Sequence, residues 1–217
     1  MEATTMTAAA VPAPVASGLE GVVVAETRLS HVDGGAGRLV LRGWSVEELA
    51  PRAGFESALS LLVRGALAEG AELRALSGRL GEARVRAFAL LDPRDPALAF
   101  ADGMDALRAL VARARVDETD AMTMALELAA IVAVAAAAWQ RSRAGGALVA
   151  PDPERGHAED YLRMATGVEP DADRVRGLDR YLVTVSDHGM NASTFAARVV
   201  TSTGSDAVSM LRRERHE

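Results

Sequence analysis

The chain has 217 residues, 49% of them hydrophobic and 25% charged, and its formal net charge is −6. This composition is typical of a folded protein with a hydrophobic core, and the acidic balance argues against a nucleic-acid-binding protein. Cysteine is absent, which excludes disulfides, a thiolate nucleophile and cysteine-bound metals. All 24 basic residues are arginine, which also excludes a Schiff-base lysine and a P-loop lysine.

The N-terminal part of the chain combines a polar arm with a predicted β element. Residues 1–17 are rich in alanine, proline and threonine, and we expect them to form a disordered arm. They lack the early positive charge and apolar core of a signal peptide, so we expect a cytoplasmic protein. Short β segments are predicted at Val22–Val24 and Arg38–Leu41, joined by the glycine-rich turn Asp33–Gly37.

The rest of the chain is predicted to be helical. Ser45 and Glu48 have the spacing of a capping box, which predicts a short helix that begins near Val46. Glycines and prolines mark a loop over Ala144–His157. Apolar residues recur at helical spacing, separated by turns, over Phe55–Leu67, Leu73–Leu80, Leu98–Ala114, Tyr161–Ala165 and Asp171–Val185.

One further predicted helix, Ala121–Trp139, approaches the length of a membrane span. Thr119 or Asp120 can cap its N-terminus. Glu127 interrupts its apolar run, and alanine, which contributes little to membrane insertion, dominates its second half. We therefore expect this helix to be buried in a soluble core or in an oligomer interface, and we expect no membrane partner.

The four histidines show no metal-binding pattern. None has a second histidine or a carboxylate at the helical i+4 spacing that a metal pair needs, so no metal site is expected. For His31, His157 and His216 we expect exposed side chains without a role. His157 is also able to contact an anionic ligand, although nothing in its surroundings indicates one.

His188 lies in a more informative context, the polar run Asp187–Thr194 between two helical stretches. Gly189 can break the first helix, and Asn191 or Ser193 can cap the second. The free N–H groups of the new helix, together with the histidine and asparagine side chains, would suit a ligand that carries a carboxylate. The alternative is a polar helix–helix turn that satisfies only its own backbone.

Two motifs carry a resemblance to a known family. The segment Tyr181–Gly204, YLVTVSDHGMNASTFAARVVTSTG, resembles the helix–turn–helix of the citrate synthase family, in which the DHxxNAST core is highly specific. The segment Gly18–Ala50 resembles the family's opening β element, with Trp44 in place of the usual tyrosine, and Phe55–Leu67 resembles its next helix. The likeness covers essentially all of Gly18–Asp206.

The resemblance implies a mainly α, citrate-synthase-like helical fold, present in part, with a small β element near the N-terminus; it spans residues 18–217. It implies a dimer and the condensation of oxaloacetate with acetyl-CoA to give citrate and CoA, a reaction of the tricarboxylic acid cycle. Acetyl-CoA or propionyl-CoA would be a co-substrate, with no bound cofactor. In the family an aspartate deprotonates the acetyl-CoA methyl group, and histidines stabilise the enol and polarise the ketone of oxaloacetate.

The family's site residues can be carried over at two positions only. His188 matches the histidine that contacts oxaloacetate, and Asn191 belongs to the same substrate-binding site. The family normally continues through GPLHGGAN and GFGHRVY segments to the catalytic aspartate, whereas here a charged tail, Leu211–Glu217, follows. His216 has no such context, so we assign no catalytic residue, and the chain resembles about the first half of a citrate synthase.

Three interpretations follow from this partial resemblance. The first, which we favour, is one subunit of a split citrate-synthase-like acyltransferase, in a homo-oligomer or in a hetero-oligomer with a chain that supplies the C-terminal half. The second is a non-catalytic truncated paralogue that binds a dicarboxylate, or that regulates or pairs with a full-length citrate synthase. The third is a truncated or frame-shifted product.

Overall fold

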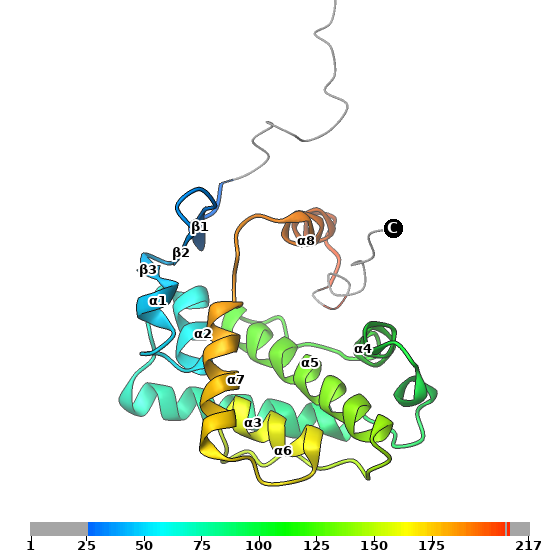
Figure 1. The fold of residues 1–217 in the computed structure, drawn as a ribbon. Helices are drawn as coiled ribbons and strands as arrows, with labels where there is room; N and C mark the ends of the chain where they lie inside the picture. Colours follow the sequence, from blue (N-terminus) through cyan, green and yellow to red (C-terminus); the bar gives the residue numbers. More distant parts are fainter. Residues whose placement is uncertain (1–25, 207, 209–217) are drawn as a thin grey trace, which may run out of the picture.

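A computed structural model of the chain describes residues 26–206 and 208 (Figure 1). The predicted arm, the strand expected at Val22–Val24 and His216 lie outside these residues. The elements are, in chain order, β1 Ser30–Asp33, β2 Arg38–Leu41, β3 Trp44–Ser45, α1 Val46–Leu49, α2 Phe55–Arg64, α3 Gly70–Ala89, the 3₁₀ helix η1 Pro96–Ala99, α4 Gly103–Val111, α5 Ala121–Arg143, α6 His157–Thr166, α7 Ala172–Thr184 and α8 Ala192–Ser202.

The β element is an antiparallel sheet in the order β1-β2-β3. Its strand β2 confirms the prediction, and the glycine-rich turn joins it to β1, with Ser30 opposite Leu41. Leu41 is 1% exposed and packs in a cluster with residues of α1, α2 and α7, of which Leu49 and Val183 are fully buried. The small sheet therefore packs against the helices through one face of β2.

The carboxylate of Asp179, on α7, fixes the start of α2. It accepts a hydrogen bond from the Phe55 backbone N–H at 2.9 Å and so satisfies one of the free donors of this helix end. A Cβ atom at Gly54 would lie 2.9 Å from the same carboxylate, so a larger residue there would have to displace the Asp179 side chain. The contact joins α2 to the helix that leads into the DHGMNAST segment.

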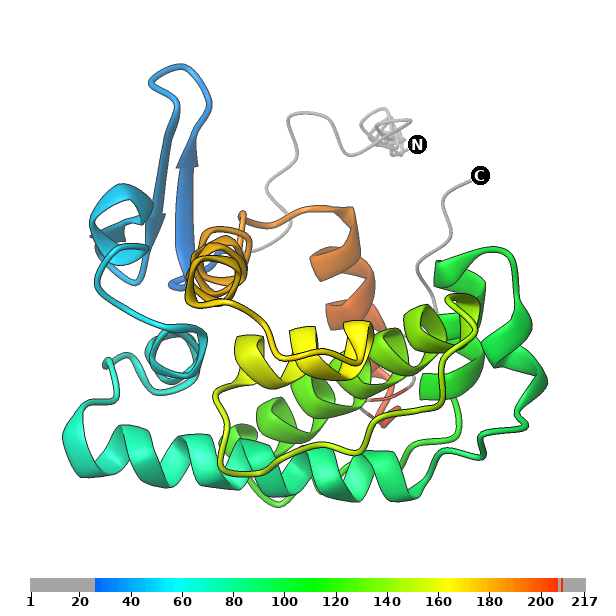
Figure 2. The same cartoon turned by 60° about the horizontal axis from the view of Figure 1, so that its bottom comes forward.

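Helix α5 lies at the centre of the helical bundle and packs against α3, α4 and α6 (Figure 2). Asp120 caps it, since its carboxylate accepts hydrogen bonds from the N–H groups of Met122 and Thr123 at 2.9 and 3.0 Å. By length and composition α5 is the one helix among the described residues that could cross a membrane, a test that core helices also pass. Half of its most apolar window is buried, which agrees with the predicted core helix.

The predicted helix Leu98–Ala114 is wrong at its start. The structure has the 3₁₀ helix η1 there, followed by a break and then by α4. The cause is Asp102, whose carboxylate accepts hydrogen bonds from the N–H groups of Met104 and Asp105 at 2.8 and 2.9 Å and so begins a new helix. The hydrophobic spacing runs through this break, which is why spacing alone did not reveal it.

A buried ion pair joins α3 to α6. Arg84 Nε donates to Asp160 Oδ2 at 2.8 Å, and both side chains are fully buried. The Nη2 atom of Arg84 also donates to the backbone carbonyls of Asp152 and Arg155, at 3.2 and 2.8 Å. Arg163 approaches the other oxygen of Asp160 at 2.7 Å. The long loop before α6 is thus held on α3 by one guanidinium group.

We expect Arg84→Met to lower the free energy of unfolding by about 3–5 kcal/mol, because the buried Asp160 carboxylate loses its main partner. The loss should fall in the lower part of this range, since Arg163 keeps its contact with the same carboxylate. Arg64→Met is the matched control, because its ion pair with Glu72 is solvent-exposed and such pairs contribute about 0–1 kcal/mol. Urea unfolding measures both variants, and equal losses would contradict the prediction.

Candidate functional site

The loop between α7 and α8 carries the DHGMNAST residues. Helix α7 ends at Thr184, well before Gly189, so the prediction that Gly189 terminates this helix is wrong. Gly189 instead turns the loop, with φ = +96°, and a Cβ atom there would lie 3.0 Å from Val32 Cγ2 on β1. Both the positive φ and the close approach of the strand require glycine.

Asp187 anchors this loop to the β element. Its Oδ1 atom accepts a short hydrogen bond from the hydroxyl of Ser30, on β1, and a second one from the Gly189 N–H at 2.8 Å. Sequence reasoning assigned no role to Asp187 or Ser30, because the two residues are 157 positions apart and no local spacing connects them. The position of His188 therefore depends on the hairpin as well as on α7.

Asn191 caps α8 and contacts His188, so the structure brings the two predicted site residues together. The Asn191 Oδ1 atom accepts a hydrogen bond from the Thr194 N–H at 2.8 Å. Of the two residues predicted as possible caps of this helix, Asn191 is therefore the cap. The amide Nδ2 then faces His188 Nε2 at 2.5 Å. Because Nδ2 is a donor, Nε2 must be the unprotonated acceptor, and the imidazole proton lies on Nδ1.

This arrangement favours binding of an anion. His188 is exposed, and its Nδ1–H is a donor directed away from Asn191. The first N–H groups of α8, at Ala192 and Ser193, are those that an α-helix leaves without partners in its own hydrogen-bond ladder. A carboxylate-bearing ligand at this helix start would meet both kinds of donor. Among residues 26–206 and 208, no group of three or more histidine, aspartate and glutamate side chains is able to hold a metal ion.

Comparison with known families identifies the fold. The model of the family described as "Citrate synthase, C-terminal domain" matches residues 18–212. The chain belongs to the citrate synthase family. It is 42% identical over 206 residues to a citrate synthase of Haloferax volcanii, covering 89% of this chain and 54% of that relative. It is 35% identical to a 2-methylcitrate synthase of Mycobacterium tuberculosis, covering 91% of this chain and 52% of that relative. The chain thus spans about half the length of these relatives.

Solved citrate synthases confirm the predicted mainly α fold. The structure from Pyrobaculum aerophilum is 31% identical and superposes with a TM-score of 0.79, covering 98% of this chain and 58% of that one. The structure from Thermoplasma acidophilum is a ternary complex with carboxymethyl coenzyme A and oxaloacetate. It is 26% identical with a TM-score of 0.73, covering 91% of this chain and 54% of that one. The oxaloacetate-binding role of His188 and Asn191 stays a prediction.

For a second histidine of this citrate synthase family member, His157, the structure contradicts the prediction. His157 is 5% exposed, so the expected exposed side chain is wrong. Its ring stacks on Phe55 at a centroid distance of 4.6 Å, and its backbone N–H donates a hydrogen bond to Glu56 Oε1 at 2.8 Å. Burial, aided by the charge of Arg84, lowers the pKa of His157 to about 3. The residue begins α6, and packing of this helix start against α2 buries it.

His31, by contrast, is exposed as predicted. It lies on β1 next to Ser30, and alternation along the strand directs the two side chains to opposite faces of the sheet. It therefore provides a control histidine that contacts neither Asp187 nor the buried core.

The buried neutral state of His157 makes the stability of the protein depend on pH. The pKa of an unfolded histidine is about 6.5, whereas that of folded His157 is about 3, so the unfolded state binds the extra proton between these values. His157 therefore removes up to about 1.4 kcal/mol of stability for each pH unit between about 6.5 and about 3, and adds no further loss outside this window.

We expect His157→Phe, which keeps an aromatic ring on Phe55, to flatten this acid dependence between pH 6 and pH 4. The measurement is urea unfolding of wild type and variant at each pH, and the difference between their slopes isolates the histidine from the carboxylates. His31→Phe should keep the wild-type slope. A His157→Phe slope equal to that of wild type would show that the buried ring does not titrate in this way.

Proposed function

We propose that this chain is one half of a split citrate-synthase-like acyltransferase that condenses oxaloacetate with acetyl-CoA or propionyl-CoA. Family membership and the half-length match to citrate and 2-methylcitrate synthases support this proposal. The observation that carries it is the pairing of His188 with Asn191 at the start of α8, which presents donors suited to a dicarboxylate. We further propose an oligomeric cytoplasmic protein that acts in the tricarboxylic acid cycle.

In the proposed reaction this chain binds and orients oxaloacetate. His188 donates its Nδ1–H to the ligand, Asn191 holds the imidazole in the tautomer that permits this, and Asp187 fixes the loop. The methyl group of an acyl-CoA thioester is a weak carbon acid, so a base must remove its proton while donors stabilise the enol oxygen. A second polypeptide would supply that base and the enol-stabilising histidine.

A non-catalytic role is the second candidate. The observation in its favour is that the motifs of the sequence assign to this chain a proposed substrate-binding pair, His188 and Asn191, but no catalytic residue. Such a protein would bind a dicarboxylate, or would pair with a full-length citrate synthase. Activity of the reconstituted pair separates the two candidates, because only the split enzyme requires this chain for turnover.

We expect His188→Ala to weaken oxaloacetate binding about tenfold or more, since a hydrogen bond to a charged group contributes about 1.5–3 kcal/mol. Isothermal titration of folded protein, with any partner chain present, measures the affinity. His31→Ala is the control and should bind as wild type does; His157 is unsuitable for this purpose because it is buried. If the His188→Ala variant binds oxaloacetate with wild-type affinity, the loop lacks the proposed role.

We also expect the isolated chain to show no detectable condensation, because loss of the base from a cooperating set costs orders of magnitude in rate. Release of the free CoA thiol from acetyl-CoA and from propionyl-CoA, each with oxaloacetate, measures it. Addition of the polypeptide that carries the other half should produce turnover. Turnover on the order of 1–1000 per second by the pure single chain would contradict the split assignment.

A further inference from the structure

One face of the β-hairpin lies against the segment that connects α7 to α8. The register pairs Ser30 with Leu41 and Val32 with Leu39, and residues opposite each other in an antiparallel ladder have their side chains on the same face. These four side chains therefore share one face of the sheet, whereas His31 lies on the other. The hairpin and the segment after α7 lie side by side in Figure 1 and Figure 2.

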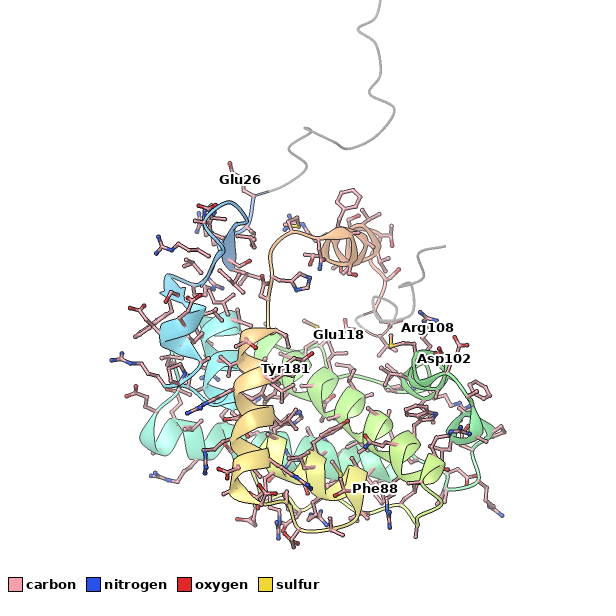
Figure 3. All side chains as sticks on the ribbon, in the orientation of Figure 1. Glu26, Phe88, Asp102, Arg108, Glu118 and Tyr181 are labelled. Atoms are coloured by element: carbon pink, nitrogen blue, oxygen red, sulfur yellow. The ribbon has the colours of Figure 1, made fainter. Side chains whose placement is uncertain are left out.

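The shared face first holds the end of α7. Leu41, which is 1% exposed, belongs to the same buried cluster as Val183, a fully buried residue in the last turn of α7. Tyr181 marks this end of the helix in Figure 3, where the chain then leaves the bundle toward α8. The loop between α7 and α8 therefore starts from a point that is already packed on the sheet.

Two further contacts of this face lie on either side of His188. Before it, the Ser30 hydroxyl donates to Asp187 Oδ1, the atom that also accepts the Gly189 N–H at 2.8 Å. After it, a Cβ atom at Gly189 would lie only 3.0 Å from Val32 Cγ2. Ser30 and Val32 are two residues apart on β1, so both reach the loop from the same face. One strand thus holds the backbone on both sides of the histidine.

Within the described part of the chain, β1 is the main external support of the loop after α7 ends. Helix α8 makes at most marginal contacts with the other described elements, so it does not fix the far end of the loop. The Asn191 N–H donates to the Gly189 carbonyl at 3.0 Å, and the Asn191 amide faces His188, but both contacts lie within the loop itself.

The hairpin is able to act as a support because it is bonded to the bundle independently of the loop. Arg42, directly after β2, donates its backbone N–H to the Leu29 carbonyl at 2.8 Å and so closes the hairpin. Its Nη2 atom donates to the carbonyl of Leu62 on α2, also at 2.8 Å. This carbonyl lies in the last turn of α2, where the helix dipole favours a positive charge.

We propose that Ser30 is a positioning residue of the oxaloacetate site, which acts by holding Asp187 and thereby the backbone that carries His188. The inference rests on the proposed function and extends it to a strand that is 157 positions away in the sequence. The donors that would meet the ligand belong to His188 and to the start of α8. Ser30 contributes by keeping the loop in the arrangement that presents them.

Ser30→Ala removes the hydroxyl donor and leaves the strand in place. Without this hydrogen bond, a smaller fraction of molecules has the loop in its binding arrangement, and the apparent affinity falls in proportion to that fraction. We expect oxaloacetate to bind about three- to tenfold more weakly, which is the range that one hydrogen bond supplies. Isothermal titration of the full chain measures the affinity, and circular dichroism confirms that each variant is folded.

Two single variants and a double variant show whether the hydroxyl acts through Asp187. Ser30→Thr keeps the hydroxyl and suits a strand, so it should bind oxaloacetate nearly as wild type does. His31→Ala, on the opposite face of β1, is the matched control and should bind as wild type does. The double variant of Ser30→Ala and Asp187→Ala should bind no more weakly than Asp187→Ala alone, because both substitutions break the same contact.

Three results would overturn the inference. The first is wild-type affinity of the Ser30→Ala variant, which would mean that the contact supports folding only. The second is a Ser30→Thr variant that binds as weakly as Ser30→Ala. The third is a double variant whose loss of affinity equals the two single losses combined, because independent losses would show that Ser30 does not act through Asp187.

Nuclear magnetic resonance separates this inference from the proposed function, because it reports on the loop without a ligand. Ser30→Ala should shift the Gly189 amide and the His188 ring ¹⁵N resonances, whereas His31→Ala should not. If these shifts occur but wild type binds no oxaloacetate, the proposed function fails and the hold of Ser30 on the loop stands. If wild type binds and His188→Ala weakens binding, but Ser30→Ala changes neither affinity nor resonances, the function stands and the inference fails.

Discussion

The fully buried pair of Arg84 and Asp160 is the interaction on which the rest of the structure depends. It fixes the start of α6 on α3 and holds the preceding loop through backbone carbonyls. The start of α6 in turn brings His157 onto Phe55, and α7 follows α6 and reaches α2 through Asp179. Through this series of contacts the pair also fixes the direction of α7, and with it the position of His188.

Local capping rules predicted much of the helical framework. Ser45, Asp120 and Asn191 begin α1, α5 and α8 as their side chains and spacing indicated, because a cap involves only neighbouring residues. Sequence reasoning failed where the deciding contact was distant. The burial of His157 depends on Glu56 and Phe55, and the anchoring of Asp187 depends on Ser30, and neither contact has a signature in local spacing.

The features around the candidate site were likewise predictable only where they depend on neighbouring residues. His188 and Asn191 lie close together because they are three positions apart in the sequence. By contrast, the apolar groove that α2, α5, α6 and α7 line appears only when these four helices are assembled. The long apolar, alanine-rich run of α5 predicted a buried helix correctly, but such a run does not show which part of the helix neighbouring elements leave uncovered.

The two contacts of Asn191 decide whether His188 faces a ligand as a hydrogen-bond donor or as an acceptor. One end of the amide must accept from Thr194 to begin α8, so the opposite end is left to face the imidazole as a donor. An aspartate at this position would still cap the helix, but it would present an oxygen to Nε2 and draw the imidazole proton there. Nδ1 would then become an acceptor toward the ligand. A single atom of residue 191 thus decides whether the neutral imidazole of His188 meets a ligand as a donor or as an acceptor.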